Sequence, residues 1–192
     1  DWANMALSTG WKLDGNIASG TDFIGTTNNQ PLVIKAYDER VGYLGGKNIF
    51  FGSSSGGSND NGESNIGIGK TTLYQNITGY YNIALGTSAL RYNTVGLGNV
   101  ALGVYSLTAN TTGDFNTAFG YASLYQNTTG KNNIALAPQS LFQNETGNSN
   151  IAIGDNALFF NKSGSTNIAI GTGALYSNTR DYIIAIGDSA LF

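Results

Sequence analysis

Asn150-Ile-Ala-Ile-Gly154 is followed, 17 residues further on, by Asn167-Ile-Ala-Ile-Gly171, and this pentapeptide sets the pattern of most of the chain. Close variants of it begin at Asn48, Asn65, Asn82, Asn99, Asn116, Asn133, Asn150 and Asn167. A last copy, from Ile183 to Gly187, comes one residue early and has isoleucine in the place of the asparagine. A fixed period of this kind is the sequence signature of a solenoid, in which each repeat forms one coil.

Other positions of the repeat also keep one residue type, and we number them from the leading asparagine as position 1. Leucine recurs at position 9, in Leu73, Leu90, Leu107, Leu124, Leu141, Leu158, Leu175 and, after the shift, Leu191. Asparagine recurs at position 12, in Asn59, Asn76, Asn93, Asn110, Asn127, Asn144, Asn161 and Asn178. Glycine recurs at position 15, in Gly62, Gly79, Gly96, Gly113, Gly130, Gly147 and Gly164, with Asp181 at the end of the series. Residues that share a position become ladders if each coil stacks on the next.

The repeat predicts an all-β parallel solenoid of nine 17-residue coils over residues 48–192. Seventeen residues are too few for a helical pair, and the apolar spacing, as in Ile151 and Ile153, has a period of two. We expect Asn-Ile-Ala-Ile-Gly to form one strand, Ala-Leu-aromatic to form a second, and Asn-Thr-Thr-Gly to close the coil as a turn. Parallel stacking of the coils would let the asparagines form side-chain amide ladders.

The column at position 3 consists of small residues and suggests self-association. If Ile134 and Leu136 point into the coil with the leucine column, the residue between them points outward. The outward column would then be Gly67, Ala84, Ala101, Ala118, Ala135, Ala152, Ala169 and Ala185. A column facing solvent would normally collect polar residues, so we expect these residues to pack against copies of themselves at a symmetry axis. The alternative is that small residues merely ease tight corners.

Position 10 forms a second outward column that is mostly aromatic. Its members are Tyr74, Arg91, Thr108, Tyr125, Phe142, Phe159, Tyr176 and Phe192. Exposed rings can stack on sugars or contact a receptor, which makes Tyr74, Tyr125, Phe142, Phe159 and Tyr176 candidates for surface contact. The alternative is that the rings stack on one another along the solenoid or against a neighbouring subunit.

Composition argues against catalysis, cofactors and several kinds of partner. The 192 residues include no cysteine and no histidine, which removes thiolate chemistry and the commonest general base and metal ligand. The net charge is −3 and no basic cluster is present, so we expect no nucleic-acid partner. No apolar run approaches the roughly 18 residues that would span a bilayer, so we expect no membrane insertion. We expect no catalytic, metal or cofactor-binding residues.

The Asn-Ile-Ala-Ile-Gly strands resemble the head repeats of trimeric autotransporter adhesins, whose coils form left-handed parallel β-rolls. The similarity covers about residues 48–192, although the coil is a few residues longer here. Residues 23–37 are similar to the segment that precedes such repeats in bacterial tail-fibre-domain proteins. The resemblance implies a homotrimer, an extracellular location on a cell, virion or fibre surface, and a binding or spacing role.

Residues 1–47 lie outside the period and contain Trp2 and Trp11. We expect them to form a small β cap over the open edge of the first coil, with a strand from Pro31 to Tyr37.

The sequence therefore favours a structural or adhesive module of a trimeric fibre that spaces or binds a surface receptor, either a glycan or a protein. An ice-binding solenoid is one alternative, but its threonines would form a flat array on one strand face. A polysaccharide-degrading tailspike is another, but it needs paired carboxylates in a groove, and the 12 acidic residues are scattered.

Overall fold

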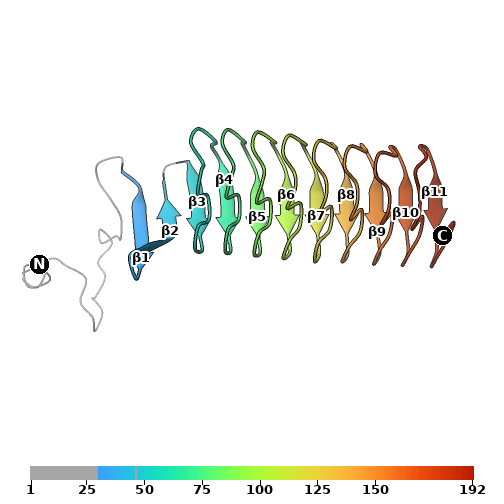
Figure 1. Cartoon of the computed structure of the whole chain (residues 1–192), viewed down its shortest axis with the longest axis horizontal. Coiled ribbons are helices and arrows are strands. Elements are labelled where there is room, and N and C mark those ends of the chain that lie inside the picture. The colour runs from blue at the N-terminus through green and yellow to red at the C-terminus, as the bar shows by residue number, and fades with distance from the viewer. Residues whose placement is uncertain (1–29, 46) are drawn as a thin grey trace, which may run out of the picture.

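The described residues form one sheet that grows along a single axis. A computed structural model describes residues 30–45 and 47–192, which form an 11-stranded sheet whose strands follow the order of the sequence. Strands β1 (Leu32–Ala36), β2 (Glu39–Leu44) and β3 (Asn48–Phe51) pair antiparallel. From β3 onward every pairing is parallel, and the strands stand side by side in one row (Figure 1).

The parallel strands are short and match the repeat. After β3 they are β4 (Asn65–Ile68), β5 (Ile83–Leu85), β6 (Val100–Leu102), β7 (Thr117–Phe119), β8 (Ile134–Leu136), β9 (Ile151–Ile153), β10 (Ile168–Ile170) and β11 (Ile184–Ile186). Equal positions lie opposite one another, as in the pair Ala135 and Ala152. At the shifted last repeat the register is kept, because Ala169 pairs with Ala185. The predicted parallel solenoid of 17-residue coils is confirmed, with about eight turns.

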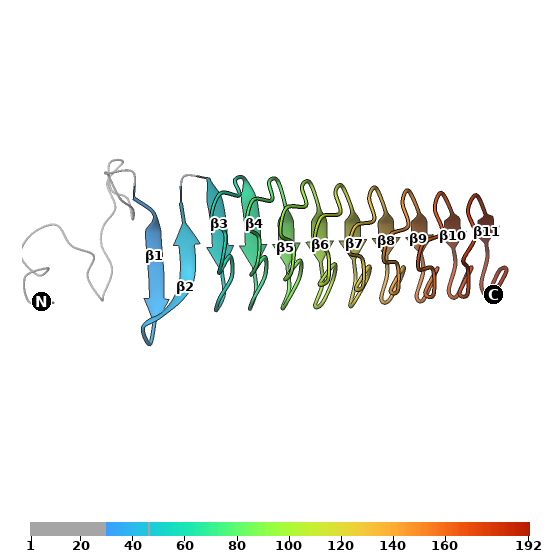
Figure 2. The same ribbon diagram turned by 45° about the horizontal axis from the view of Figure 1, so that its top comes forward.

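Each coil contains one strand, and the predicted second strand at Ala-Leu-aromatic is wrong. The segment is a turn, in which the leucine at position 9 has a left-handed backbone with φ between 47° and 53°. Neighbouring coils still bond to each other there, as where Leu90 N donates to Ser106 O at 3.1 Å. In the tilted view the strands lie on one side of the row and the chain returns on the other (Figure 2).

The expected direction of the side chains in the strand is also wrong. Position 3 points into the coil, where it meets the leucine column, and positions 2 and 4 point outward. Ala84, Ala101, Ala118, Ala135, Ala152 and Ala169 are fully buried within a single chain, Ala185 is 4% exposed, and Gly67 is buried. The interior is narrow: a Cβ on Gly67 would come within 2.9 Å of Ser55 Oγ and 3.0 Å of Thr72 Oγ1. Where position 9 is leucine only a very small side chain fits at position 3, whereas in the first coil Gly56 at position 9 leaves room for the buried Phe50. These residues are therefore core and do not line a symmetry axis.

Two asparagine ladders complete the interior, and both are confirmed. At position 12 the amide nitrogens from Asn76 to Asn161 donate to the amide oxygen one coil back, as from Asn93 to Asn76 at 2.7 Å. At position 1, Asn82 Nδ2 donates to Asn65 Oδ1 at 3.2 Å. The ladders meet at position 15, because Asn82 and Asn93 both donate to the carbonyl oxygen of Gly96. Buried amides of this kind are tolerated because their polar atoms find partners.

Candidate functional site

The most prominent surface is the outward side of the parallel strands. We call it the outer sheet face and define it by positions 2 and 4 of β4 to β11. Its members are Ile66, Ile68, Ile83, Leu85, Val100, Leu102, Thr117, Phe119, Ile134, Leu136, Ile151, Ile153, Ile168, Ile170, Ile184 and Ile186. Every residue is apolar except Thr117. The opposite side of the same strands carries the alanine column, so both sides of the sheet are apolar.

The outer sheet face is accessible in a single chain. Its side chains are half-buried or exposed, with Ile153 at 37% and Phe119 at 56%. Such a large contiguous apolar surface usually marks a contact with another molecule. Sheets that are apolar on both sides are normally covered on both sides, whereas a solvated face alternates with polar residues. Sequence reasoning missed this face. The signal for it was the apolar run Ile-Ala-Ile, in which neither the inward nor the outward position is polar.

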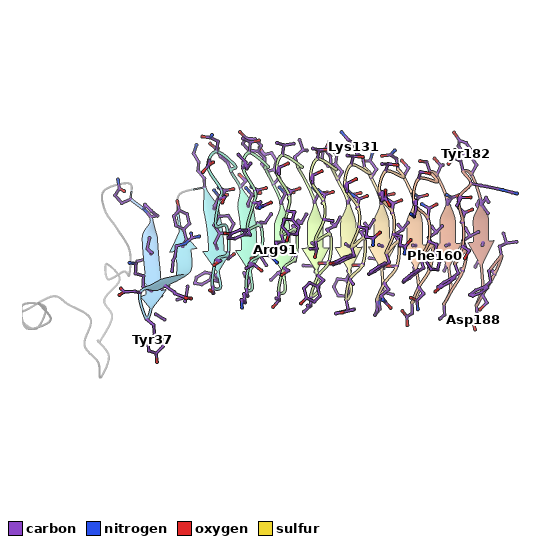
Figure 3. The ribbon with its side chains drawn as sticks, in the orientation of Figure 1. Tyr37, Arg91, Lys131, Phe160, Tyr182 and Asp188 are labelled. Carbon is purple, nitrogen blue, oxygen red and sulfur yellow. The ribbon has the colours of Figure 1, made fainter. Side chains whose placement is uncertain are left out.

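Aromatic residues extend the apolar surface at both edges of its middle coils. Tyr81 and Phe115 lie at position 17, just before the strands, and are 67% and 58% exposed. Tyr105 and Tyr121 lie just after the strands, with their ring centroids 6.1 Å apart in an edge-to-face arrangement. Figure 3 marks these two edges: Lys131 and Tyr182 lie where the strands begin, and Asp188 lies where they end.

The aromatic column at position 10 is a continuous stack over its second half. Tyr125, Phe142 and Phe159 are parallel, with successive centroids 5.2 and 5.0 Å apart. Tyr176 and Phe192 continue the stack at 5.3 and 4.9 Å. Phe160, labelled in Figure 3, packs edge-on against two of these rings. The ring faces cover one another, so the stack offers mainly ring edges to solvent. This geometry favours a structural role for four of the five predicted contact residues, namely Tyr125, Phe142, Phe159 and Tyr176.

The first half of the column is interrupted. The guanidinium of Arg91 lies 6.0 Å from the ring centroid of Tyr74 and 5.0 Å from that of Tyr92. Thr108 is buried, and its hydroxyl donates to the carbonyl oxygens of Ser88 and Tyr105. Tyr74 is therefore separated from the stack and has a different environment from the other predicted contact residues.

The outer sheet face itself contains no charged residue, and the ion pairs lie at its edge or beyond it. Lys131 pairs with Asp114 at 2.7 Å, Lys162 lies 3.8 Å from Glu145, and Lys47 pairs with Glu63. These pairs are exposed or partly exposed and contribute little to stability. Within residues 30–45 and 47–192, no three acidic side chains gather where they could hold a metal ion. The same residues contain no helix suited to crossing a membrane.

The predicted site residues thus fall into separate environments. The alanine column is inside the coil, the aromatic column is mostly self-stacked, and the outer sheet face, which was not predicted, is the accessible apolar surface. The predicted N-terminal cap covers residues 1–47, of which 1–29 and 46 lie outside the described residues. Comparisons with family models, curated proteins and solved structures gave no match.

Proposed function

We propose that this chain is the structural or adhesive segment of an extracellular homotrimeric fibre, and that its copies pack through the outer sheet face. The observation that carries the proposal is the exposed apolar surface of β4 to β11. Burying apolar area contributes roughly 25 cal/mol per Å². A thin coil whose interior holds one column of leucines beside alanine and asparagine gains little of that contribution, and a second buried face would add to it.

A second copy of the chain is the occupant that best fits this face. Its columns carry no charge, so identical faces would approach without electrostatic repulsion. The columns also repeat at the spacing of the coils, so copies aligned in parallel would match along their whole length. The number three, the left hand of the coil and the extracellular location rest on the resemblance to adhesin head repeats.

The hairpin of β1 and β2 supports a capping role for the segment before the repeats. It pairs with the edge of β3 that would otherwise be open. Tyr43 packs against Phe50 of the first coil, with ring centroids 6.1 Å apart. An open edge of a parallel sheet invites strand addition, so we propose that this hairpin protects the first coil.

Ice binding has less support as a second function. The outward columns of the strands contain a single threonine, Thr117. The threonines of the closing turn use their hydroxyls within the protein, as where Thr111 Oγ1 donates to Thr128 O at 2.9 Å.

Native mass spectrometry of the full chain tests the proposal, with an expected mass of three times 20.1 kDa. The variant Ile153→Lys places charge on the outer sheet face and should release folded monomers. Asp155→Lys, at the exposed corner two residues away, is the matched control and should remain trimeric. A wild-type monomer, or equal assembly of the two variants, would exclude packing through this face.

A further inference from the structure

A cleft of about 370 Å³ lies where β2 meets the first two coils. It is lined by Glu39, Arg40, Ser53, Ser54, Gly57 and Tyr74. Its volume is within the usual range for small-molecule sites, about 300 to 1,000 Å³. The lining residues from the coils occupy positions 6, 7 and 10, none of which belongs to the outer sheet face.

Tyr74 is the aromatic wall of the cleft. In the preceding coil its column position is occupied by Gly57, and a Cβ on that glycine would come within 2.6 Å of the Tyr74 ring. No ring therefore stacks on Tyr74 from that side, whereas the rings from Tyr125 to Phe192 stack on one another. The absence of a side chain at residue 57 lets the ring lie close against the backbone there, and the half-buried ring still lines the cleft.

The hydrogen-bonding capacity of the polar groups in the cleft is only partly used. Arg40 Nη2 donates to the carbonyl oxygens of Ser55 at 2.6 Å and Gly56 at 3.2 Å, which anchors the guanidinium. Ser53 Oγ donates to Glu39 Oε2 at 3.1 Å. The remaining N–H groups of Arg40 and the other oxygen of Glu39 have no hydrogen-bond partner among the described residues. An anchored donor and an exposed acceptor thus stand beside a ring.

We propose that this cleft binds a neutral saccharide. The apolar C–H groups of a pyranose ring contact the part of the Tyr74 ring that lines the cleft, and its hydroxyls donate to Glu39 and accept from Arg40. One carboxylate and one guanidinium balance each other, and an acidic sugar would meet the carboxylate of Glu39. The inference names the class of ligand for the surface-binding role proposed above, and it rests on that role. It does not depend on formation of the trimer, because each cleft is complete within one chain.

The test is binding of the full chain to an array of immobilised neutral and acidic oligosaccharides, followed by calorimetric titration with the strongest neutral one. We expect neutral saccharides to bind, and Tyr74→Ala to weaken the binding at least about tenfold. Tyr125→Ala removes a ring from the same column away from the cleft and should leave binding unchanged. Glu39→Ala, an exposed site at the start of β2, should weaken binding, whereas the exposed Asp155→Ala should not.

The assignment would be overturned if no saccharide on the array bound, if only acidic saccharides bound, or if Tyr74→Ala and Tyr125→Ala lost equal amounts of binding affinity. Circular dichroism of each variant shows whether the coil is intact, and Glu39→Ala decides the case if Tyr74→Ala does not fold. The mass measured on the same sample separates this inference from the assembly. A trimer that binds no sugar contradicts the cleft alone, and a monomer that binds sugar contradicts the trimer alone.

Discussion

The side-chain nitrogen of Asn127 donates a hydrogen bond to the side-chain oxygen of Asn110, one coil nearer the N-terminus, over 2.7 Å. The same nitrogen donates to the carbonyl oxygen of Gly130 at 3.0 Å. The oxygen of Asn127 accepts from Asn144 at 2.8 Å. A single side chain therefore satisfies polar atoms in three successive coils, all of them inside the solenoid where water cannot replace it.

Replacing this asparagine should be costly. Asn127→Ala removes one partner from each of three buried polar groups and leaves a small cavity, so we expect a loss of about 2 to 5 kcal/mol in the free energy of unfolding. Urea denaturation at a fixed protein concentration measures it. Gln126→Ala, at the adjacent half-buried residue, is the control and should change stability by less than about 0.5 kcal/mol. Equal stability of the two variants would mean that the ladder contributes nothing.

The alanine column gives a second prediction, opposite to the one that an axial position would give. Because Ala135 is fully buried inside the coil, Ala135→Leu overpacks the core and should lower the free energy of unfolding by about 1 to 3 kcal/mol or more. Ile134→Leu, on the outer sheet face of the same strand, should cost less than about 1.5 kcal/mol. Thermal unfolding and native mass are measured for both. If the Ala135→Leu variant remained stably folded but dissociated into monomers, the alanine column would instead lie at a subunit interface.

The comparison of positions 3 and 4 shows what the sequence could and could not predict. The 17-residue period, the parallel register and the asparagine ladders were predictable, because a strict repeat places equal residues side by side. The direction of the strand side chains was not predictable, because alternation with a period of two looks the same whether the odd or the even positions point into the coil. Volume decides the matter: between the strand and the opposite wall there is room for the methyl of Ala152 and not for Ile153. That distance depends on the turns, which the repeat does not specify.

The turn at the leucine column was wrongly predicted to be a strand for a related reason. Leu124 has φ 50°, a left-handed conformation that non-glycine residues adopt only where the surroundings enforce it. Leu124→Ile keeps the side-chain volume but introduces a branch at Cβ, which is strongly disfavoured there, so we expect a loss beyond the usual limit of about 1.5 kcal/mol for such exchanges. Leu136→Ile makes the same exchange in β8 and should cost less than that. Unfolding in urea would contradict this account if both variants lost the same amount.

The corner after β8 holds a residue that its backbone does not suit. Ala137 has φ 126°, and the same corner elsewhere is glycine, as at Gly120 with φ 138° and Gly154 with φ 134°. This region is essentially restricted to glycine, and other residues cost about 1 to 3 kcal/mol there. Ala137→Gly should therefore raise the free energy of unfolding by about 1 kcal/mol, the net after the greater flexibility of the unfolded glycine chain. A decrease in the urea midpoint would show that no strain is released.

The shortened last turn interrupts the ladder at position 12. Asn178 Nδ2 donates to the carbonyl oxygen of Arg180 at 2.9 Å, and the buried Oδ1 of Asn161 has no partner among the described residues. Asn178-Thr-Arg180 leads directly to Asp181, whereas the complete turn reads Asn110-Thr-Thr-Gly113-Asp114. The missing glycine is therefore the physical cause of the unpaired oxygen.

Insertion of one glycine between Arg180 and Asp181 should restore the turn and the bond from Asn178 to Asn161. A buried acceptor that regains its partner is worth about 1 to 3 kcal/mol, so the free energy of unfolding should rise by roughly that amount. An insertion of glycine between Asp188 and Ser189, in the last corner, is the control for a general effect of chain length and should bring no gain. Amide-proton exchange of the Asn178 side chain should slow in the first variant only. If the first variant were no more stable than the control, the shortened turn would not be the cause of the break in the ladder.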